Sequence, residues 1–361
     1  MMVKVMNMKK ITKLTAVILA LTLMFSFLVG CKKSVDSDYL SSTIVVYENG
    51  DSTGQNNEKD NGFGLGDLFG GSKENLLLYK KVKLENYIEV PEYKGIVVDT
   101  KSQEFLKYYN KIFEDDIEQK SLYKETNIIE NGYIANIDFV GKIDGVAFDG
   151  GTGKEYNLKI GSNTFIDDFE EQLIGVKSGA TKDVVVTFPS DYSEKTLAGK
   201  EAVFTVTVNY VGCPMTIEES YEKMGFESAE KYTSNITSRA IDEYLLNYVC
   251  SKAKIKDYPE DDKKILGDAI YNHYAAIASA SGTDFQQLLL GNGMTADQFK
   301  DQFSIEFMKT NMVMYYIFYA EGLKMIESTL QKQEVSEPAI AESYAVQEIA
   351  ISYLYEKAEI K

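Results

Sequence analysis

Residues for nucleophilic or metal chemistry are scarce in this 361-residue chain, which has one histidine and three cysteines. His273 lies in an apolar stretch of helical spacing, where a packing role is expected, and no nucleophile elbow accompanies it. Cys31, Cys213 and Cys250 form no CxxC pair and no Cys/His cluster. The sequence therefore predicts no metal site and no cofactor, and it disfavours a histidine-dependent triad or dyad.

Aromatic residues at strand spacing are the more promising groups, and they gather between residues 131 and 212. Residues two apart share one face of a strand. Three such faces are Ile137-Phe139-Gly141, Val184-Val186-Phe188 and Phe204-Val206-Val208-Tyr210. A short helix is expected at residues 169–174, capped by Asp167 or Asp168 and stopped by Gly175. The region therefore predicts a compact antiparallel β domain with one helix.

Four motifs follow one another in this region. They are Asp138-Phe139-Val140-Gly141, Asp144-Gly145-x-x-Phe148-Asp149-Gly150-Gly151, Ile160-Gly161-x-x-x-Phe165-Ile166-x-x-Phe169-Glu170 and Val186-Thr187-Phe188-Pro189-x-x-Tyr192. Leu197-x-Gly199-Lys200 and Phe204 come next. Each motif alone is weak, but in this order and spacing residues 132–211 resemble an FKBP domain of the trigger-factor subtype.

This resemblance implies a peptidyl-prolyl cis-trans isomerase of FKBP type, with an apolar pocket as its active site. The residues with an implied catalytic role are Phe139, Phe148, Asp149, Ile166, Phe169 and Phe204. The residues with an implied substrate-binding role are Tyr156, Phe165, Tyr192 and Leu197. The resemblance implies that Asp149 lies at the rim of the pocket and that the backbone N–H of Ile166 binds a substrate carbonyl. It also implies that Tyr192 lies in a loop over the pocket. The alternative for each aromatic residue is an ordinary core position, which is expected for Phe188 and Tyr210.

One stretch departs from the family pattern. Where trigger factors read Ile-Pro-Gly-Phe, this chain reads Ile166-Asp167-Asp168-Phe169. Asp is a good helix N-cap, so the fold is expected to survive. Two carboxylates beside an apolar pocket would weaken substrate binding, and the catalytic strength stays open.

The N-terminus predicts an exported, lipid-anchored protein. Lys9, Lys10 and Lys13 precede an apolar run at residues 14–29, and Leu28-Val29-Gly30-Cys31 closes it. This junction resembles the lipobox of bacterial lipoproteins. We therefore expect a signal peptide at residues 1–30, lipidation of Cys31, a flexible tether at residues 31–75, and an extracytoplasmic location on the cell membrane. The alternatives are a plain secretory signal and an uncleaved anchor.

The remaining residues predict helices on both sides of the β domain. Residues 76–130 contain strand-like segments and an amphipathic helix at about 101–123, begun by Thr100 and Gln103 as a capping box. Residues 213–361 are helical in pattern, with start signals at Thr216, Pro259, Thr295 and Pro338. They resemble the helical body of trigger factor. The fold class is therefore α+β: an FKBP-like antiparallel sheet wrapped on a short helix, plus an all-α body.

One helix in the C-terminal part carries apolar residues on both sides, which are Met312, Met314, Tyr315, Tyr316, Phe318 and Tyr319. Such a helix is either buried all round or lines a concave apolar surface. Met and aromatic side chains adapt to varied partners. The resemblance to trigger factor favours the concave surface, which would hold unfolded chains.

The expected function is thus proline isomerisation and chaperone action on unfolded or partly folded exported polypeptides with X-Pro bonds. The alternative is a non-catalytic peptide-binding chaperone with a weak or inactive FKBP domain. A solute-binding lipoprotein is disfavoured because no βαβ alternation is present. A net charge of -17 argues against nucleic acid as a partner. No ribosome docking is expected, because a signal peptide and a tether take the place of trigger factor's ribosome-docking domain. The clients, the oligomeric state and any pairing of Cys213 with Cys250 stay open.

Overall fold

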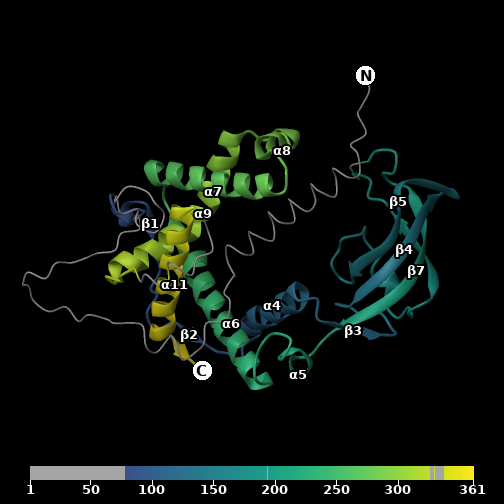
Figure 1. The fold of residues 1–361 in the computed structure, drawn as a ribbon, viewed down its shortest axis with the longest axis horizontal. Coiled ribbons are helices and arrows are strands. Elements are labelled where there is room, and N and C mark those ends of the chain that lie inside the picture. Colours follow the sequence, from purple (N-terminus) through teal and green to yellow (C-terminus); the bar gives the residue numbers. More distant parts are fainter. Residues whose placement is uncertain (1–77, 193, 326–328, 330–336) are drawn as a thin grey trace, which may run out of the picture. The chain divides into compact units, whose positions relative to one another are not determined.

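The computed structural model describes residues 78–192, 194–325, 329 and 337–361 (Figure 1). Cys31, the predicted signal peptide and the predicted tether lie outside these residues. The chain divides into two compact units. Residues 110–236 form the sheet unit, and residues 78–109 with 237–361 form the helical unit. The helices α4 (Gln103–Gln119) and α6 (Ala229–Lys252) each contribute to both units.

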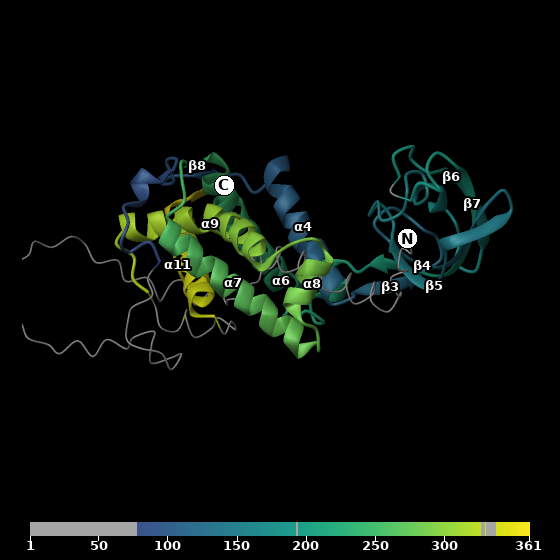
Figure 2. The same ribbon diagram turned by 90° about the horizontal axis from the view of Figure 1, so that it is seen from above.

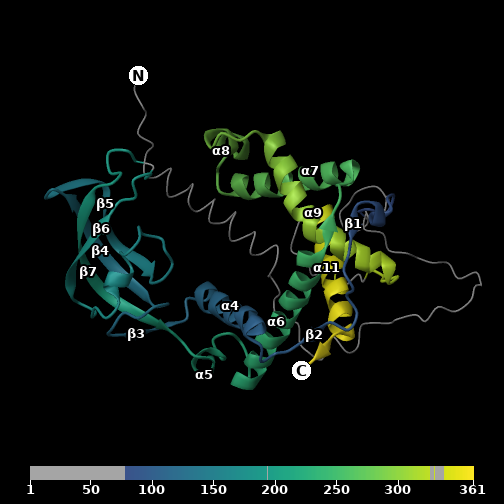
Figure 3. The ribbon, with the colours of Figure 1, turned by 180° about the vertical axis from the view of Figure 1, so that it is seen from behind.

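The sheet unit contains one five-stranded antiparallel sheet, visible in Figures 1 and 3. Its strands are β3 (Tyr123–Thr126), β4 (Ile134–Ile143), β5 (Val146–Lys159), β6 (Thr181–Thr187) and β7 (Glu201–Pro214). The strand order is β3-β7-β4-β5, and β6 also pairs with β7. The sheet begins with β3, ahead of the predicted boundary at residue 131, because β3 is held by pairing with the distant strand β7.

Turn and bulge geometry sets which side chains enter the core of this sheet. Asp144 and Gly145 join β4 to β5 with positive φ angles of 51° and 79°, the pattern of a tight hairpin turn. The predicted faces of β4 and β6 are buried, as is Phe188. The prediction for Tyr210 is wrong, because it is 43% exposed. A register shift in the β4–β7 pairing between Val208 and Tyr210 moves Tyr210 off the core face.

The predicted short helix is smaller than expected. It is a single 3₁₀ turn, η2 (Glu171–Leu173), and its N-terminal flanking residue Glu170 makes no side-chain cap. Asp168 takes a left-handed φ of 68°, and Gly175 takes 83°. The prediction of an Asp cap is therefore wrong. Asp tolerates the left-handed region better than most residues, which explains how the turn persists without the glycine of the family pattern.

The helix α4 is shorter than the predicted 101–123, and its start differs. Ser102 Oγ accepts a hydrogen bond from the Phe105 N–H at 3.1 Å. Thr100, the predicted cap, instead donates its hydroxyl to the carbonyl of Lys361 at 2.8 Å. The apolar residues Phe105, Ile112 and Ile117 of α4 are buried, as the helical spacing predicts.

The C-terminal helices confirm the four predicted starts. They are α5 (Ile217–Ser220), α6, α7 (Glu260–Ala280), α9 (Ala296–Ala320) and α11 (Pro338–Lys357). Capping boxes occur at Thr216 with Glu219 and at Thr295 with Gln298. Pro259 flanks the start of α7, and Pro338 is the first residue of α11. The sequence reading missed α8 (Phe285–Gly291). Figure 2 shows α7 beside α9.

Two short strand pairs join the N-terminal part of the helical unit to its C-terminal part. β1 (Ile88–Glu89) follows the turn η1 (Leu84–Asn86) and pairs with β8 (Lys254–Ile255), and β2 (Val97–Val98) pairs with β9 (Glu359–Ile360). Tyr93 and Tyr353 each donate a hydroxyl to Glu321 at 2.5 Å. The helical unit is therefore built from segments more than 160 residues apart in the sequence.

The helix α9 is the centre of the helical unit. Met312, Met314, Tyr315 and Phe318 are all buried, and α9 packs against both α7 and α11. The expectation that this helix lines an open concave surface is therefore wrong for these side chains, because neighbouring helices cover them. Tyr319 remains partly exposed, and its hydroxyl donates to the carbonyl of Leu78 at 2.8 Å.

His273 lies half-buried on α7 with its ring 5.7 Å from that of Tyr274, and burial lowers its pKa. Cys213 and Cys250 are both free thiols. Within the described part of the chain, no helix is long and apolar enough to cross a bilayer. The same residues contain no group of His, Cys, Asp and Glu suited to hold a metal ion.

Candidate active site

Six of the predicted site residues meet in one aromatic cluster inside the sheet unit, and this set is called the aromatic cluster below: Phe139, Phe148, Tyr156, Phe165, Phe169 and Phe204. Phe165 lies 4.2 Å from Phe169 and 5.2 Å from Phe139 between ring centroids. Phe204 lies 5.3 Å from Phe169 and 5.8 Å from Phe148. These separations are typical of favourable aromatic pairs.

The cluster is assembled from three strands and one loop. Phe139 comes from β4, Phe148 and Tyr156 come from β5, and Phe204 comes from β7. The loop after β5 supplies Phe165 and Phe169. Residues that lie far apart in the sequence are therefore side by side in the structure. The face pattern of a single strand does not identify such a group.

Three glycines let these rings lie directly against the backbone. A Cβ on Gly153 would lie 2.5 Å from Phe139 Cε1, and a Cβ on Gly141 would lie 2.5 Å from Phe204 Cε1. A Cβ on Gly151 would lie 2.8 Å from Phe148 Cε2. Real Cβ atoms do not approach other atoms so closely, so a side chain at any of these positions would displace a ring. The sequence analysis placed Gly141 on a strand face, quoted Gly151 only as part of a motif and gave Gly153 no role.

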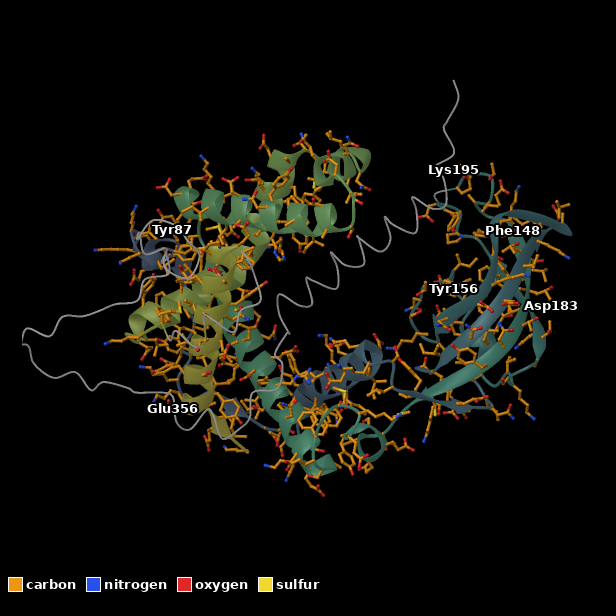
Figure 4. All side chains as sticks on the ribbon, viewed as in Figure 1. Tyr87, Phe148, Tyr156, Asp183, Lys195 and Glu356 are labelled. Atoms are coloured by element: carbon orange, nitrogen blue, oxygen red, sulfur yellow. The ribbon has the colours of Figure 1, made fainter. Side chains whose placement is uncertain are left out.

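The cluster runs from the core to the surface. Phe139, Phe169 and Phe204 are buried, with Phe169 at 0% exposure. Phe148 and Phe165 are partly buried, and Tyr156 is 39% exposed. Figure 4 labels Phe148 and Tyr156 on the sheet unit. The buried rings therefore form a rigid base, and the outer rings offer an apolar aromatic surface to a ligand.

The other predicted site residues border this surface. Ile166, Tyr192 and Leu197 are partly buried and pack against the same core. Tyr192 reaches the cluster through Phe188, whose ring lies 4.8 Å from Tyr192 and 5.7 Å from Phe148. Phe188 is thus a core residue, as expected, and its ring also connects Tyr192 to Phe148.

The backbone N–H of Ile166 is the group to which the resemblance assigns the substrate carbonyl. Its carbonyl accepts a hydrogen bond from the Phe169 N–H at 3.2 Å. Its own N–H donates to no atom of the residues that the structure describes. A partly exposed donor beside an aromatic surface is suited to bind a carbonyl oxygen.

Asp149 lies next to Phe148 and is exposed. The structure brings it into no hydrogen bond or ion pair with a described residue, so its predicted rim position stays a prediction. Asp138, also from a site motif, has a structural role instead. Its carboxylate accepts hydrogen bonds from the Glu155 N–H at 2.7 Å and from Asn209 Nδ2 at 2.9 Å, and these bonds lower its pKa.

Comparison with known proteins gives a match for the sheet unit and for much of the chain. Residues 125–209 match the family described as FKBP-type peptidyl-prolyl cis-trans isomerase. The chain therefore contains an FKBP-type domain within a mixed helix and sheet fold. A trigger factor of Bacillus cytotoxicus is 31% identical over 290 residues, in a match that covers 72% of this chain and 66% of that protein. A trigger factor of Halothermothrix orenii is 31% identical over 280 residues, in a match that covers 70% of this chain and 63% of that protein.

The chain spans somewhat less than two thirds of the length of these relatives. A solved structure titled "Promiscuous Substrate Recognition in Folding and Assembly Activities of the Trigger Factor Chaperone" aligns with 75% of this chain and 73% of its own. Its identity is 16% and its TM-score is 0.25, which is too low to support an argument about the fold.

Proposed function

We propose, from the FKBP-type domain at residues 125–209, that this protein isomerises X-Pro peptide bonds in unfolded or partly folded polypeptides and also holds such chains as a chaperone. The observation that carries the proposal is the aromatic cluster beside the N–H of Ile166, which has no acceptor among the described residues. Trigger-factor relatives over about 70% of the chain support both parts.

The cluster suits the chemistry of this reaction. Rotation about an X-Pro bond has a barrier of about 18–20 kcal/mol that comes from amide resonance. The twisted amide has lost its conjugation and is less polar than the planar one. An apolar aromatic surface from which water is excluded therefore favours the twisted form. The Ile166 N–H would hold the substrate carbonyl in place while the bond turns, and no proton needs to be transferred.

Isomerase activity is tested with a peptide whose cis and trans X-Pro forms differ in fluorescence or in susceptibility to a protease. The full chain should accelerate interconversion, and the double variant Phe139→Leu/Phe148→Ala should not. Equal rates with the wild type, the variant and no protein would contradict the enzymatic part of the proposal.

A non-catalytic peptide-binding chaperone is the second candidate. The observation that favours it is the pair Asp167 and Asp168, two exposed carboxylates between Ile166 and Phe169. The assay above separates the two candidates, because peptide binding without acceleration would support the second one.

The chaperone part is tested on the helical unit. A cavity of about 490 Å³ opens at the loop between α7 and α8, with Tyr271 and Phe285 in its lining. Leu290 of α8 is exposed. A chain in which residues 123–214, from the start of β3 to the end of β7, are replaced by a short linker should still suppress aggregation of a refolding client. A folded variant that gives no protection would remove the chaperone part and leave the isomerase.

The place of action is proposed from the N-terminal sequence alone. Leu28-Val29-Gly30-Cys31 supports cleavage before Cys31 and its lipidation. The clients would then be exported proteins at the outer face of the cell membrane, and the lipid would be the link to that membrane.

A further inference from the structure

A buried carboxylate organises the loop that carries the proposed carbonyl donor. Glu170 follows Phe169 and is only 3% exposed. Residues 161–165 are called the site loop here, because they lead directly into Ile166. Five donors of the site loop bind the Glu170 carboxylate at 2.8–3.3 Å: the N–H groups of Gly161, Asn163, Thr164 and Phe165 and the hydroxyl of Ser162.

The two oxygens of this carboxylate hold different parts of the loop. Oε2 accepts from Gly161 at 2.8 Å and from Asn163 at 3.2 Å. Oε1 accepts from Thr164 at 2.9 Å and from Phe165 at 3.3 Å. A buried charge is costly unless it is well hydrogen-bonded, and bonds from N–H groups to a carboxylate are stronger than neutral ones.

No lysine or arginine among the described residues forms an ion pair with Glu170. The backbone of the site loop therefore supplies the compensation for its charge. Burial and several hydrogen bonds from backbone N–H groups fix the Glu170 side chain. The same hydrogen bonds fix the site loop.

The hydrogen bonds to Glu170 extend as far as Phe165, the residue directly before Ile166. Phe165 is the last residue of the site loop whose N–H binds Glu170, and its ring stacks on Phe169, the residue before Glu170. The next amide, that of Ile166, has no acceptor among the described residues. We propose that Glu170 is a positioning residue, which fixes the site loop so that the Ile166 N–H and the Phe165 ring are preorganised for the substrate. This inference rests on the proposed isomerase site.

Positioning and simple stabilisation make different predictions. If Glu170 only stabilised the fold, its loss would lower the fraction of folded protein, which lowers the apparent kcat and leaves KM unchanged. If Glu170 positions the substrate-binding amide, its loss raises KM in molecules that are fully folded.

The test uses the full chain with Glu170→Gln, which keeps the size of the side chain but replaces one acceptor oxygen by an NH₂ donor. The matched control is Glu171→Gln, because Glu171 is the adjacent carboxylate and is exposed. We expect kcat/KM on an X-Pro peptide to fall about tenfold in E170Q with a raised KM, and to stay within twofold of the wild type in E171Q. Amide hydrogen exchange at residues 161–165 should accelerate in E170Q alone.

An unchanged KM in E170Q, with kcat reduced only by the unfolded fraction, would overturn the proposal. If E170Q does not fold, Glu170→Asp decides in the same way, because it keeps the charge and withdraws the carboxylate by one methylene.

Titration with the same peptide, followed by the amide NMR signal of Ile166, separates this inference from the proposed activity. If the wild type binds the peptide without isomerising it, the enzymatic proposal fails. A weaker Ile166 response in E170Q then still supports the role of Glu170, and equal responses in both proteins overturn it. Absence of any response in the wild type overturns both.

Discussion

The ring of Phe165 stacks on the ring of Phe169, with 4.2 Å between their centroids and 19° between their planes. Phe169 is fully buried, and Phe165 is partly exposed. The stack therefore connects the surface of the aromatic cluster to the core of the sheet unit. Because Ile166 lies between the two rings in the sequence, its N–H is held by a short segment that is fixed at both ends.

Phe148→Ala should lower isomerase activity more than it lowers stability. Phe148 is half-buried and contacts Phe204 and Phe188, so its ring supplies both packing and apolar surface for substrate. Loss of a Phe contact surface is worth about 1.5–3 kcal/mol, so kcat/KM should fall roughly tenfold to a hundredfold. The measurement is kcat/KM on an X-Pro peptide beside the melting temperature.

The control is Tyr210→Ala, an aromatic residue of β7 that is exposed and lies outside the cluster. It should leave kcat/KM unchanged. Parallel losses of activity and melting temperature in Phe148→Ala would identify Phe148 as an ordinary core residue.

Gly153→Ala should disturb the aromatic cluster without changing its composition. The new methyl group would lie 2.5 Å from Phe139 Cε1, so the ring must move. Overpacking of this kind costs about 1–3 kcal/mol. We expect a lower melting temperature and a change in the near-ultraviolet circular dichroism of the aromatic rings.

Gly291→Ala is the matched control, because a Cβ there meets nothing within 4 Å and Gly291 ends the helix α8. Ala is the better helix former by about 0.5–1 kcal/mol. This variant should be neutral or slightly stabilising. A Gly153→Ala protein with wild-type stability would show that the rings are not held against the backbone.

The resemblance, which rests on motif order and spacing, implied that Phe139, Phe148, Phe169 and Phe204 share one pocket. The structure brings these rings together, and their catalytic roles stay predictions. The sequence also predicted the starts of α9 and α11, because capping residues and proline act locally.

The predictions that were wrong depend on contacts between distant segments, which a local sequence pattern does not contain. Tyr210 follows a register shift in the pairing of β7 with β4, and strand periodicity fails at such a shift. The apolar residues of α9 face α7 and α11, and the sequence of one helix does not say which neighbours cover it. The sequence analysis quoted Glu170 in a motif but gave it no role. An acidic residue directly after an aromatic core residue is an unusual signal, and it could have drawn attention to Glu170.

The carboxylates of Asp167 and Asp168 should make the site prefer cationic peptides. Both are exposed and lie between Ile166 and Phe169. Two unit charges 4 Å apart in water interact by about 1 kcal/mol, which is roughly a fivefold effect. Peptides with Lys beside the proline should therefore have a severalfold higher kcat/KM than peptides with Glu, and 1 M salt should remove the difference.

The double variant Asp167→Asn/Asp168→Asn should abolish this preference. Asp183→Asn serves as its control, since Asp183 is exposed on β6 and binds the hydroxyl of Thr205. A preference that survives in the double variant would have to come from other charges.

Cys31→Ala should release the protein from the membrane or block its processing. The prediction rests on the lipobox-like residues 28–31 and concerns a part of the chain outside the described residues. The measurement is fractionation of cells that express the wild type or the variant, with metabolic labelling by a fatty acid. A variant that is processed and retained on membranes as before would contradict the lipoprotein assignment.

The stability of the helical unit should fall as the pH rises through 7, because of Glu342 on α11. Glu342 is buried and accepts hydrogen bonds from the Leu78 N–H at 3.0 Å and from the hydroxyl of Tyr315. Burial is the main cause that raises its pKa from 4.5 to about 7, and the two hydrogen bonds only partly oppose it. Asp262, which accepts from the Tyr79 N–H at 2.9 Å, also has a raised pKa, mainly through burial.

A carboxyl group whose pKa is raised in the folded state binds its proton more tightly there than in the unfolded chain. Its contribution to stability is therefore complete below pH 4.5 and is lost as the pH rises to about 7. The shift corresponds to roughly 3 kcal/mol. The lowered pKa of His273 acts in the opposite direction, so the useful quantity is the difference between the wild type and Glu342→Gln.

Glu342→Gln keeps the shape of the side chain and removes its titration. The free energy of unfolding, measured by urea denaturation from pH 5 to pH 8, should fall more steeply in the wild type than in this variant. Glu356→Gln, at an exposed position on the same helix, should follow the wild type, because surface ion pairs such as that with Lys357 contribute little. Parallel curves for the wild type and Glu342→Gln would mean that Glu342 does not change its protonation in the folded protein over this range.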